Sequence, residues 1–289
     1  MNYKISYVIC LLLLATFKIH SQNRVAPIMK DSIIDYIDSV KDVTSCIEFN
    51  NRFDNKLVFW GRDFGDKQYG VESNIIYKQG KGLYLYLTNN YWSAMVNKFA
   101  KIDLGIGYEH QFNDRIYASA RYERWFFQNG RRYGRRALKN CINANLDIDL
   151  DYINVETSLY SMWGIEHVYQ IDLNLYQEIQ LFPIFKSGFV TTTPQFLTSF
   201  ANQALLPIYS DVSFNYINER KFTLVDMELS LPIQLKIRNL KIGPDFHYNI
   251  PIKIENEEIN PFFYFSIHLN YNFYFDHGKL KRIYRQLAS

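Results

Sequence analysis

Residues 261–275 read PFFYFSIHLNYNFYF, and their side chains divide into two rows. The odd-numbered row from residue 263 to residue 275 holds only aromatic and aliphatic side chains, whereas the row between them is mostly polar and includes Ser266, His268 and Asn270. Because successive side chains of a β-strand point to opposite faces, the segment predicts one strand with an apolar face and a polar face. It is far longer than a usual globular strand of about 5–6 residues, and long enough for a tilted strand to cross a membrane.

Segments with the same alternation recur along most of the 289-residue chain. In residues 138–150, for example, Ile142, Ala144 and Leu146 alternate with Asn143 and Asn145. Strands are expected at residues 56–61, 68–78, 82–93, 99–111, 115–127, 138–150, 153–160, 169–176, 179–192, 225–234, 240–250 and 261–275.

The links between these segments indicate how the strands are connected. Short links at 79–82, 113–114, 149–152 and 237–239 separate longer links at 94–98, 128–137, 194–222 and 251–260, with 161–166 as a short exception. Outer-membrane barrels have short periplasmic turns and long outer loops. The fold class expected is therefore all-β, an antiparallel transmembrane β-barrel of about 12 strands (range 10–14). Its last strand should descend to the periplasm and pair with a first strand at 56–61.

A soluble β-sandwich also alternates, with its apolar face inward. The expected strands are longer than sandwich strands, and their polar faces carry charged and amide side chains at mid-strand, as a hydrated lumen would. Aromatic residues gather near strand ends, where membrane barrels have girdles at the two interfaces. Examples are Tyr69 and Tyr77, Tyr91 and Trp92, Trp125 and Phe126, Tyr160 and Trp163, and Phe273 to Phe275.

The chain ends indicate secretion. Residues 1–21 combine an early Lys4, an apolar run from Val8 to Ala15 and a small-residue site near Ser21, which is typical of a signal peptide. We expect a periplasmic segment with a short amphipathic helix at 22–45, the barrel at 46–275 and a basic periplasmic tail at 276–289. The expected location is the outer membrane of a Gram-negative bacterium.

Charge and cysteine content exclude several classes of protein. Removing the signal peptide takes away Lys4 and Lys18 and no acid, so the net charge falls from +3 to +1. Such a balance argues against a nucleic-acid partner, because binding to nucleic acid depends on neutralising phosphates. Only Cys46 and Cys141 remain, so no disulfide framework holds the fold, although a single bridge between them stays open.

Three stretches resemble outer-membrane β-barrels of the Bacteroidetes type: KLVFWGRDFGDKQYG at 56–70, GLYLY and YWS within 82–93, and the ending PFFYFSIHLNYNFYF. The resemblance covers residues 46–275. The family has no assigned activity, so the resemblance implies an outer-membrane location, with the barrel-assembly machinery as a partner during insertion, and no mechanism. One departure is that fourteen residues follow Phe275, where such barrels commonly end on an aromatic residue.

The polar rows supply the candidate site residues. If the rows line a lumen, acids outnumber bases in it, and an open lumen of this kind would favour cations. The candidate lumen-lining residues are Asp103, Glu109, Arg121, Glu123, Asp147, Glu156, Asp172, Asp226, Glu228 and His268. The alternative is that these groups pair across the interior and close it.

A cluster of four arginines in QNGRRYGRRA lies in an expected outer loop: Arg131, Arg132, Arg135 and Arg136. Arginine forks suit phosphate, so this loop is a candidate contact for lipopolysaccharide. The alternative is a solvated loop with no ligand.

Two further patterns resemble a calcium site and a catalytic pair, but neither meets the requirements of such a site. Asp147, Asp149 and Asp151 alternate as in a calcium loop, but the glycine and glutamate that an EF-hand needs are missing. Ser266 and His268 share a face, yet neighbours two apart on a strand lie about 6.5–7 Å apart at Cα, so we expect no Ser–His dyad. The histidines show no metal-ligand spacing, and no cofactor is expected.

The sequence therefore predicts a non-enzymatic outer-membrane barrel, first of all a small pore or passive transport protein with an acid-rich lumen. The alternative is a structural or surface-binding barrel that acts through its outer loops. A lipid-modifying enzyme of the outer membrane is a remote alternative.

Overall fold

The computed structural model describes residues 44–59, 62–63, 68–80, 82–93, 101–127, 138–164, 167–184, 188–202, 222–253 and 259–276. The expected signal peptide, the N-terminal helix and the basic tail beyond Asp276 lie outside these residues. Within them, no helix has the length and apolar character needed to span a membrane.

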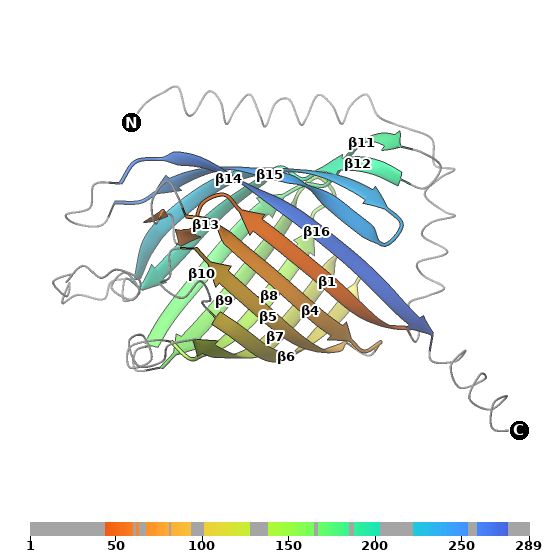
Figure 1. Ribbon diagram of the computed structural model, residues 1–289, viewed down its shortest axis with the longest axis horizontal. Coiled ribbons are helices and arrows are strands. Elements are labelled where there is room, and N and C mark those ends of the chain that lie inside the picture. Colours follow the sequence, from red (N-terminus) through yellow and green to blue (C-terminus); the bar gives the residue numbers. More distant parts are fainter. Residues whose placement is uncertain are drawn as a thin grey trace, which may run out of the picture. The chain divides into compact units, whose positions relative to one another are not determined.

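The described chain consists of strands that pair antiparallel with their neighbours in the sheet (Figure 1). The strands are β1 (Thr44–Asp54), β2 (Val58–Phe59), β3 (Arg62–Asp63), β4 (Gly70–Lys78), β5 (Leu83–Trp92), β6 (Lys101–Asn113), β7 (Ile116–Phe127), β8 (Asn140–Asp149), β9 (Asn154–Trp163), β10 (His167–Tyr176), β11 (Ile179–Ile184), β12 (Gly188–Thr192), β13 (Gln195–Asn202), β14 (Phe222–Ile237), β15 (Leu240–Pro251) and β16 (Phe262–Asp276).

These strands close into a barrel. Most neighbours in sequence pair with each other, but β1 pairs with β4 and β10 pairs with β13. β14 pairs with both β13 and β15, and β16 pairs with β1 from Thr44↔Asp276 to Asp54↔Ser266. The closed circuit has 12 strands, and β11 and β12 continue the β10–β13 hairpin beyond it. Within this circuit closure leaves no sheet edge, which is the condition for a sheet in hydrocarbon. The expected fold class is confirmed.

The N-terminal strand differs from the expectation. The strand that pairs with β16 is β1, and residues 56–61 contribute only β2, which forms a two-residue ladder with β3. β1 reads TSCIEFNNRFD, and its outward row contains Asn51 between Phe49 and Phe53. That polar residue hides the alternation, so the prediction of a first strand at 56–61 was wrong.

The middle of the chain holds a second correction. The stretch 179–192 is a hairpin of β11 and β12 rather than one strand, and β13 lies within the supposed long loop 194–222. β12 and β13 both run along β14, with Pro194 at the interruption between them. A proline has no backbone N–H to donate to a ladder, which explains both the break and its loop-like appearance in the sequence. Val212, Phe214 and Tyr216, whose alternation in the sequence predicts a hairpin extending outside, lie outside the described residues.

Exposure separates the two faces of the wall. Along β5, exposed Leu83, Leu85 and Leu87 alternate with buried Tyr84 and Tyr86. Exposed large apolar side chains line the outward rows of most strands, whereas most of the buried polar side chains belong to inward rows. This arrangement is the reverse of a soluble protein and is typical of a transmembrane barrel. Two aromatic residues expected in a girdle, Trp125 and Tyr160, instead pack inside against buried apolar residues.

Two glycines on β6 make room for tyrosine rings on β5. Gly105 stands opposite Tyr86 and Gly107 opposite Tyr84, and a Cβ on either glycine would lie 2.1 Å and 2.3 Å from the facing ring. The Arg121 guanidinium lies over the Tyr86 ring at 5.6 Å. Glycine in a strand interior is unfavourable by itself, so these two positions are explained by the rings that cover them.

We predict that Gly105→Ala lowers the free energy of unfolding in lipid vesicles by about 1–3 kcal/mol, because the new methyl group overlaps the Tyr86 ring. Denaturant titration of refolded protein measures it. In a Tyr86→Ala background the same change should cost little, since the ring is gone. An equal cost in both backgrounds would show that the ring contact does not set the requirement for glycine.

Candidate functional site

The side chains that fill the interior of the barrel differ between its two ends. We call the end with the short links 79–82, 114–115, 150–153 and 238–239 the turn end, and the opposite end the loop end. Toward the loop end, side chains of five adjacent strands (β8, β9, β10, β13 and β14) and of Leu138, just before β8, form an apolar cluster, with Trp125 and Tyr160 packed against it. Its members are Leu138, Cys141, Met162, Val168, Ala201 and Val225. This part of the interior is a packed core.

A polar cluster fills the loop-end interior on the other side of the barrel, where β14, β15, β16 and β1 meet. His247 lies at its centre, with Nδ1 2.8 Å from Glu228 Oε1 and Nε2 3.0 Å from Ser266 Oγ. The His247 ring stacks on Tyr264 at a centroid distance of 4.2 Å, and the Tyr264 hydroxyl donates to Glu228 Oε2 at 2.7 Å. Because buried polar groups need partners, these contacts hold the cluster together.

The same cluster corrects one expectation about Ser266 and His268. His268 Nε2 lies 2.9 Å from Ser266 Oγ, so the two side chains do contact along the strand. The Cα spacing alone predicts no contact, but the imidazole is long enough to span it. His247, which comes from the neighbouring strand, is the second histidine on Ser266, and only the register of β15 against β16 reveals it.

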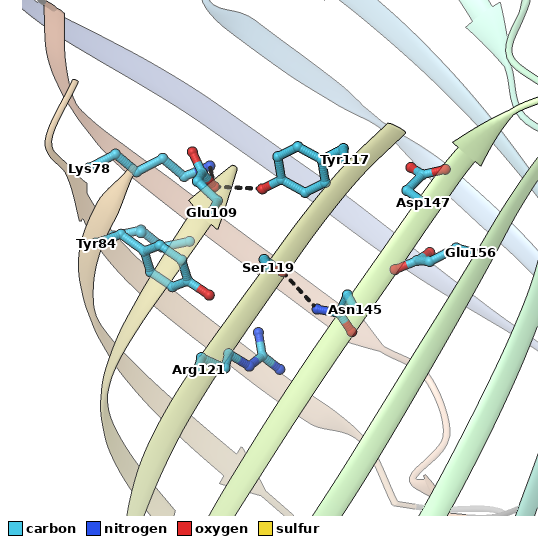
Figure 2. A pocket seen from close by; sticks show the side chains of 10 residues that line it. Lys78, Tyr84, Glu109, Tyr117, Ser119, Arg121, Asn145, Asp147 and Glu156 are labelled. Carbon is cyan, nitrogen blue, oxygen red and sulfur yellow. Dashed lines mark hydrogen bonds and ion pairs between the residues drawn. The ribbon is translucent and has the colours of Figure 1, made fainter. Parts of the chain in front are cut away.

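Toward the turn end the inner wall encloses a cavity of about 230 Å³. Figure 2 shows side chains from several strands projecting into it. Its lining residues are Ile76, Lys78, Tyr84, Glu109, Tyr117, Ser119, Arg121, Asn145, Asp147 and Glu156. We call this space the turn-end cavity.

Ion pairs and hydrogen bonds hold the walls of the turn-end cavity. Lys78 Nζ lies 3.1 Å from Glu109 and 3.3 Å from Glu48, while the Tyr117 hydroxyl donates to Glu109 at 2.7 Å. Asp147 accepts a hydrogen bond from the Tyr176 hydroxyl at 2.5 Å. Lys78 is therefore shared between two acids, whereas Asp147 is hydrogen-bonded to a neutral hydroxyl.

A second cavity of about 370 Å³ lies beside β1, β4, β14, β15 and β16. Arg52, Glu72, Lys241 and His268 supply its charged or titratable lining, together with Asn50, Asn51, Gln234, Leu269 and Asn270. Arg52 Nε donates to Asp54 at 2.6 Å, and the side chains of Asn50 and Asn270 are hydrogen-bonded across the β1–β16 closure. His268 therefore links this cavity to the polar cluster around Ser266.

The candidate lumen residues fall into three groups in space. Four line the turn-end cavity: Glu109, Arg121, Asp147 and Glu156. Three belong to the polar cluster or border it: Asp226, Glu228 and His268. The remaining three have local partners, since Asp103 contacts Asn90 and Lys101, Glu123 contacts Arg121 and Trp125, and Asp172 contacts Gln170.

Sequence reasoning missed several inward residues of the same groups. Lys78 and Tyr117 line the turn-end cavity. His247 and Asp245, whose Nε2 and Oδ2 atoms lie 3.3 Å apart, belong to the polar cluster. Strand alternation marks all of them as members of a polar or mixed row, but only strand register shows which ones meet.

Other sequence candidates have simpler places. Asp149 accepts a hydrogen bond from the Asp151 backbone N–H at 2.8 Å, and Asp151 pairs with Arg115 at 2.9 Å, so the Asp-x-Asp run forms the β8–β9 turn. Across the described residues, no group of three or more ligand side chains is arranged to hold a metal ion. Cys46 and Cys141 are free and buried. Arg131, Arg132, Arg135 and Arg136 lie outside the described residues.

These features define the class of protein, a closed transmembrane β-barrel with apolar side chains outward and a polar, partly filled interior. No family model matches the sequence, and no curated protein matches it either.

Solved structures with a similar chain trace include two porins. The KdgM porin aligns with a TM-score of 0.44 at 9% identity, over 79% of this chain and 99% of that chain. The NanC porin aligns with a TM-score of 0.42 at 10% identity, over 78% and 97%. LpxR from Salmonella typhimurium aligns with a TM-score of 0.40 at 8% identity, over 79% and 99%. At these scores the similarity says nothing about what this chain binds.

We predict that His247→Leu lowers the free energy of unfolding by about 3 kcal/mol, because it leaves Glu228 and Ser266 buried without their shared partner. Denaturant titration in vesicles measures the change. The control is His110→Leu, a histidine exposed on the outward face of β6, which should change stability little. Equal effects of the two substitutions would contradict a structural role for the polar cluster.

Proposed function

We propose that this chain is an outer-membrane β-barrel that works as a narrow pore or passive transport protein for small cations, without enzymatic activity. The observation that carries the proposal is the turn-end cavity, where Glu109, Asp147 and Glu156 face Lys78 and Arg121. Each of these two bases already has an acid partner, because Lys78 contacts Glu48 and Glu109, and Arg121 contacts Glu123 at 2.7 Å. The wall therefore keeps an excess of negative charge, which attracts cations.

Outer-membrane location is part of the proposal. Exposed apolar rows on the outside of the barrel need hydrocarbon around them, and the N-terminal sequence predicts a signal peptide. Membrane lipid and the barrel-assembly machinery are then its expected partners, and lipopolysaccharide remains a candidate for the four-arginine loop.

The packed loop-end interior limits what passes. The apolar cluster and the polar cluster both occupy the inside of the barrel between the turn-end cavity and the loop end. A barrel of 12 strands is narrow enough for side chains to fill part of its width. We therefore expect small conductance and passage of small ions rather than large solutes.

Planar-bilayer recording on the refolded mature chain tests this function. We predict channels of small conductance that prefer K⁺ over Cl⁻. The triple change Glu109→Gln, Asp147→Asn and Glu156→Gln should lower the K⁺/Cl⁻ permeability ratio severalfold, because it removes the charge that favours cations.

The matched control is Asp151→Asn, which removes an acid that is 59% exposed in the β8–β9 turn, outside the cavity lining. Its permeability ratio should equal that of the unchanged protein. Anion selectivity or the absence of any conductance would reject the pore, and the alternative of a structural or surface-binding barrel would then take its place.

A second candidate function, hydrolysis, follows from one observation. Ser266 Oγ, His247 and Glu228 are connected as a nucleophile, a base and an orienting acid would be. However, Ser266 is 0% exposed and faces the interior, where no lipid can reach it, and its Oγ also contacts His268. A buried polar cluster that fills the barrel accounts for the same contacts.

We predict that a fluorophosphonate reagent leaves Ser266 unmodified in the folded barrel, because the hydroxyl is not accessible. Intact-mass spectrometry after incubation checks this, with Ser266→Ala and Ser161→Ala as the variants that locate any label. Labelling that disappears only in Ser266→Ala would reverse the assignment and favour an enzyme.

A further inference from the structure

The outward rows of the barrel strands contain one side chain that does not suit lipid. Among the described strands of the barrel, Arg124 on β7 is the sole Arg, Lys, Asp or Glu on the outward face. Its place there follows from its cross-strand neighbour Leu104, which is 47% exposed with the other outward apolar residues. A charged residue in contact with the membrane is costly unless it has a use or lies near an interface.

Arg124 lies near the loop end, three residues before β7 ends at Phe127. There the cost of arginine on the lipid face of a barrel falls from about 2–4 kcal/mol at the midplane to about 0–1 kcal/mol. This position places the Arg124 guanidinium at the depth of the lipid headgroups. The apolar rows that face the acyl chains begin next to it.

Neighbouring polar groups hold this guanidinium in place. Arg124 Nη1 donates to Asn140 Oδ1 at 2.7 Å, and the Tyr122 hydroxyl donates to the same oxygen at 2.9 Å. Asn140 is largely buried, and its Nδ2 lies 3.4 Å from the Trp163 carbonyl oxygen. Because one amide positions both donors, the arginine is ordered before any ligand arrives, which lowers the entropic cost of binding.

Aromatic rings lie next to Arg124 and Asn140 along the loop end of the barrel. Trp163 lies 6.2 Å from the Tyr122 ring and 6.3 Å from the His167 ring, and His167 stacks on Tyr169 at 4.6 Å. Amphipathic rings of this kind sit at the membrane–water interface. Below them the outward rows of β8 and β9 carry Ile142 and Leu159, each 48% exposed, which would meet acyl chains.

We propose that Tyr122, Arg124, Asn140, Trp163, His167 and Tyr169 form a binding site for the phosphate-bearing headgroup of a membrane lipid. The arginine fork matches the phosphate oxygens, and the rings and aliphatic rows match the glycerol or sugar region and the chains. The inference rests on the membrane location within the proposed function and not on pore activity. It concerns residues different from the four-arginine loop.

The experiment uses the whole mature chain in nanodiscs of phosphatidylcholine with a minor fraction of phosphatidylglycerol, followed by extraction in detergent and native mass spectrometry. The unchanged protein should retain phosphatidylglycerol in preference to phosphatidylcholine. Arg124→Gln should reduce this retention about tenfold, which is the loss of one charge-assisted hydrogen-bonded contact. Arg124→Lys keeps the charge but lacks the forked guanidinium. Its phosphatidylglycerol retention should lie between that of the unchanged protein and that of Arg124→Gln.

The matched control is Arg115→Gln, an exposed arginine just before β7 at the turn end, which should retain lipid as the unchanged protein does. Unaltered retention in Arg124→Gln, or an equal loss in Arg115→Gln, would overturn the site. Conductance should be the same in the unchanged protein and in the three variants, so a failed pore and a failed lipid site are distinguishable.

A measurement on the unchanged protein covers the case in which Arg124→Gln does not fold. Phosphatidylglycerol should raise its unfolding temperature in detergent more than phosphatidylcholine does, and inorganic phosphate alone should not. Equal stabilisation by the two lipids, or full stabilisation by inorganic phosphate, would reject a lipid headgroup site.

Discussion

Backbone hydrogen bonding in hydrocarbon is the constraint on which the rest of this structure depends. Water is absent there, so each backbone N–H and C=O must find its partner within the protein, and a sheet can satisfy this only by closing on itself. The pairing of β1 with β16 supplies that closure along eleven residue pairs, from Thr44↔Asp276 to Asp54↔Ser266. The first and last described strands of the barrel, more than two hundred residues apart in sequence, are neighbours for this reason.

Closure also explains the composition of the two faces. Once the sheet is a barrel, one set of alternate side chains meets lipid and the other meets the interior, so apolar rows can be exposed and charged rows enclosed. Inside a circle of 12 strands the long polar side chains are close enough to pair, as Lys78 does with Glu48 and Glu109. Where the Tyr84 and Tyr86 rings of β5 lie inward, Gly107 and Gly105 on β6 make the space.

Much of the fold could be predicted from alternation alone, because period-two patterning is local. The strands from Gly70 to Tyr176 were expected within a few residues of their observed bounds, and the total of 12 was right. That agreement in number concealed two errors, at β1 and at β13. Each error arises at a residue that interrupts the pattern, Asn51 within β1 and Pro194 just before β13. Both segments are recognised as strands only by their partners β16 and β14.

The candidate site was less predictable for a related reason. The side chains of the polar rows could be named from sequence, but contacts such as His247 with Ser266 and Glu228 join three strands and depend on register. Backbone spacing also misjudged Ser266 and His268, because side-chain length can close a gap that Cα positions leave open. The alternation of β7 does not single out Arg124. One charged residue in an apolar row becomes informative only when the paired strands show that the row faces lipid.

The interior is unequal along the barrel, and this inequality bears on how a pore would work. The loop-end half holds the apolar cluster around Met162 and the hydrogen-bonded cluster around His247, whereas the turn-end half holds an acid-rich cavity. An ion entering from the turn end would first meet a negative wall that favours its arrival and then a packed layer that resists its exit. Selectivity and conductance would therefore depend on different halves, because charge in the cavity sets which ions enter and the loop-end layer sets how many pass.

A layer built partly from hydrogen bonds can rearrange more readily than one built only from hydrocarbon packing, since each broken bond can be replaced by one to water. On this argument the polar side of the layer, between β14 and β1, is the side along which a path would open.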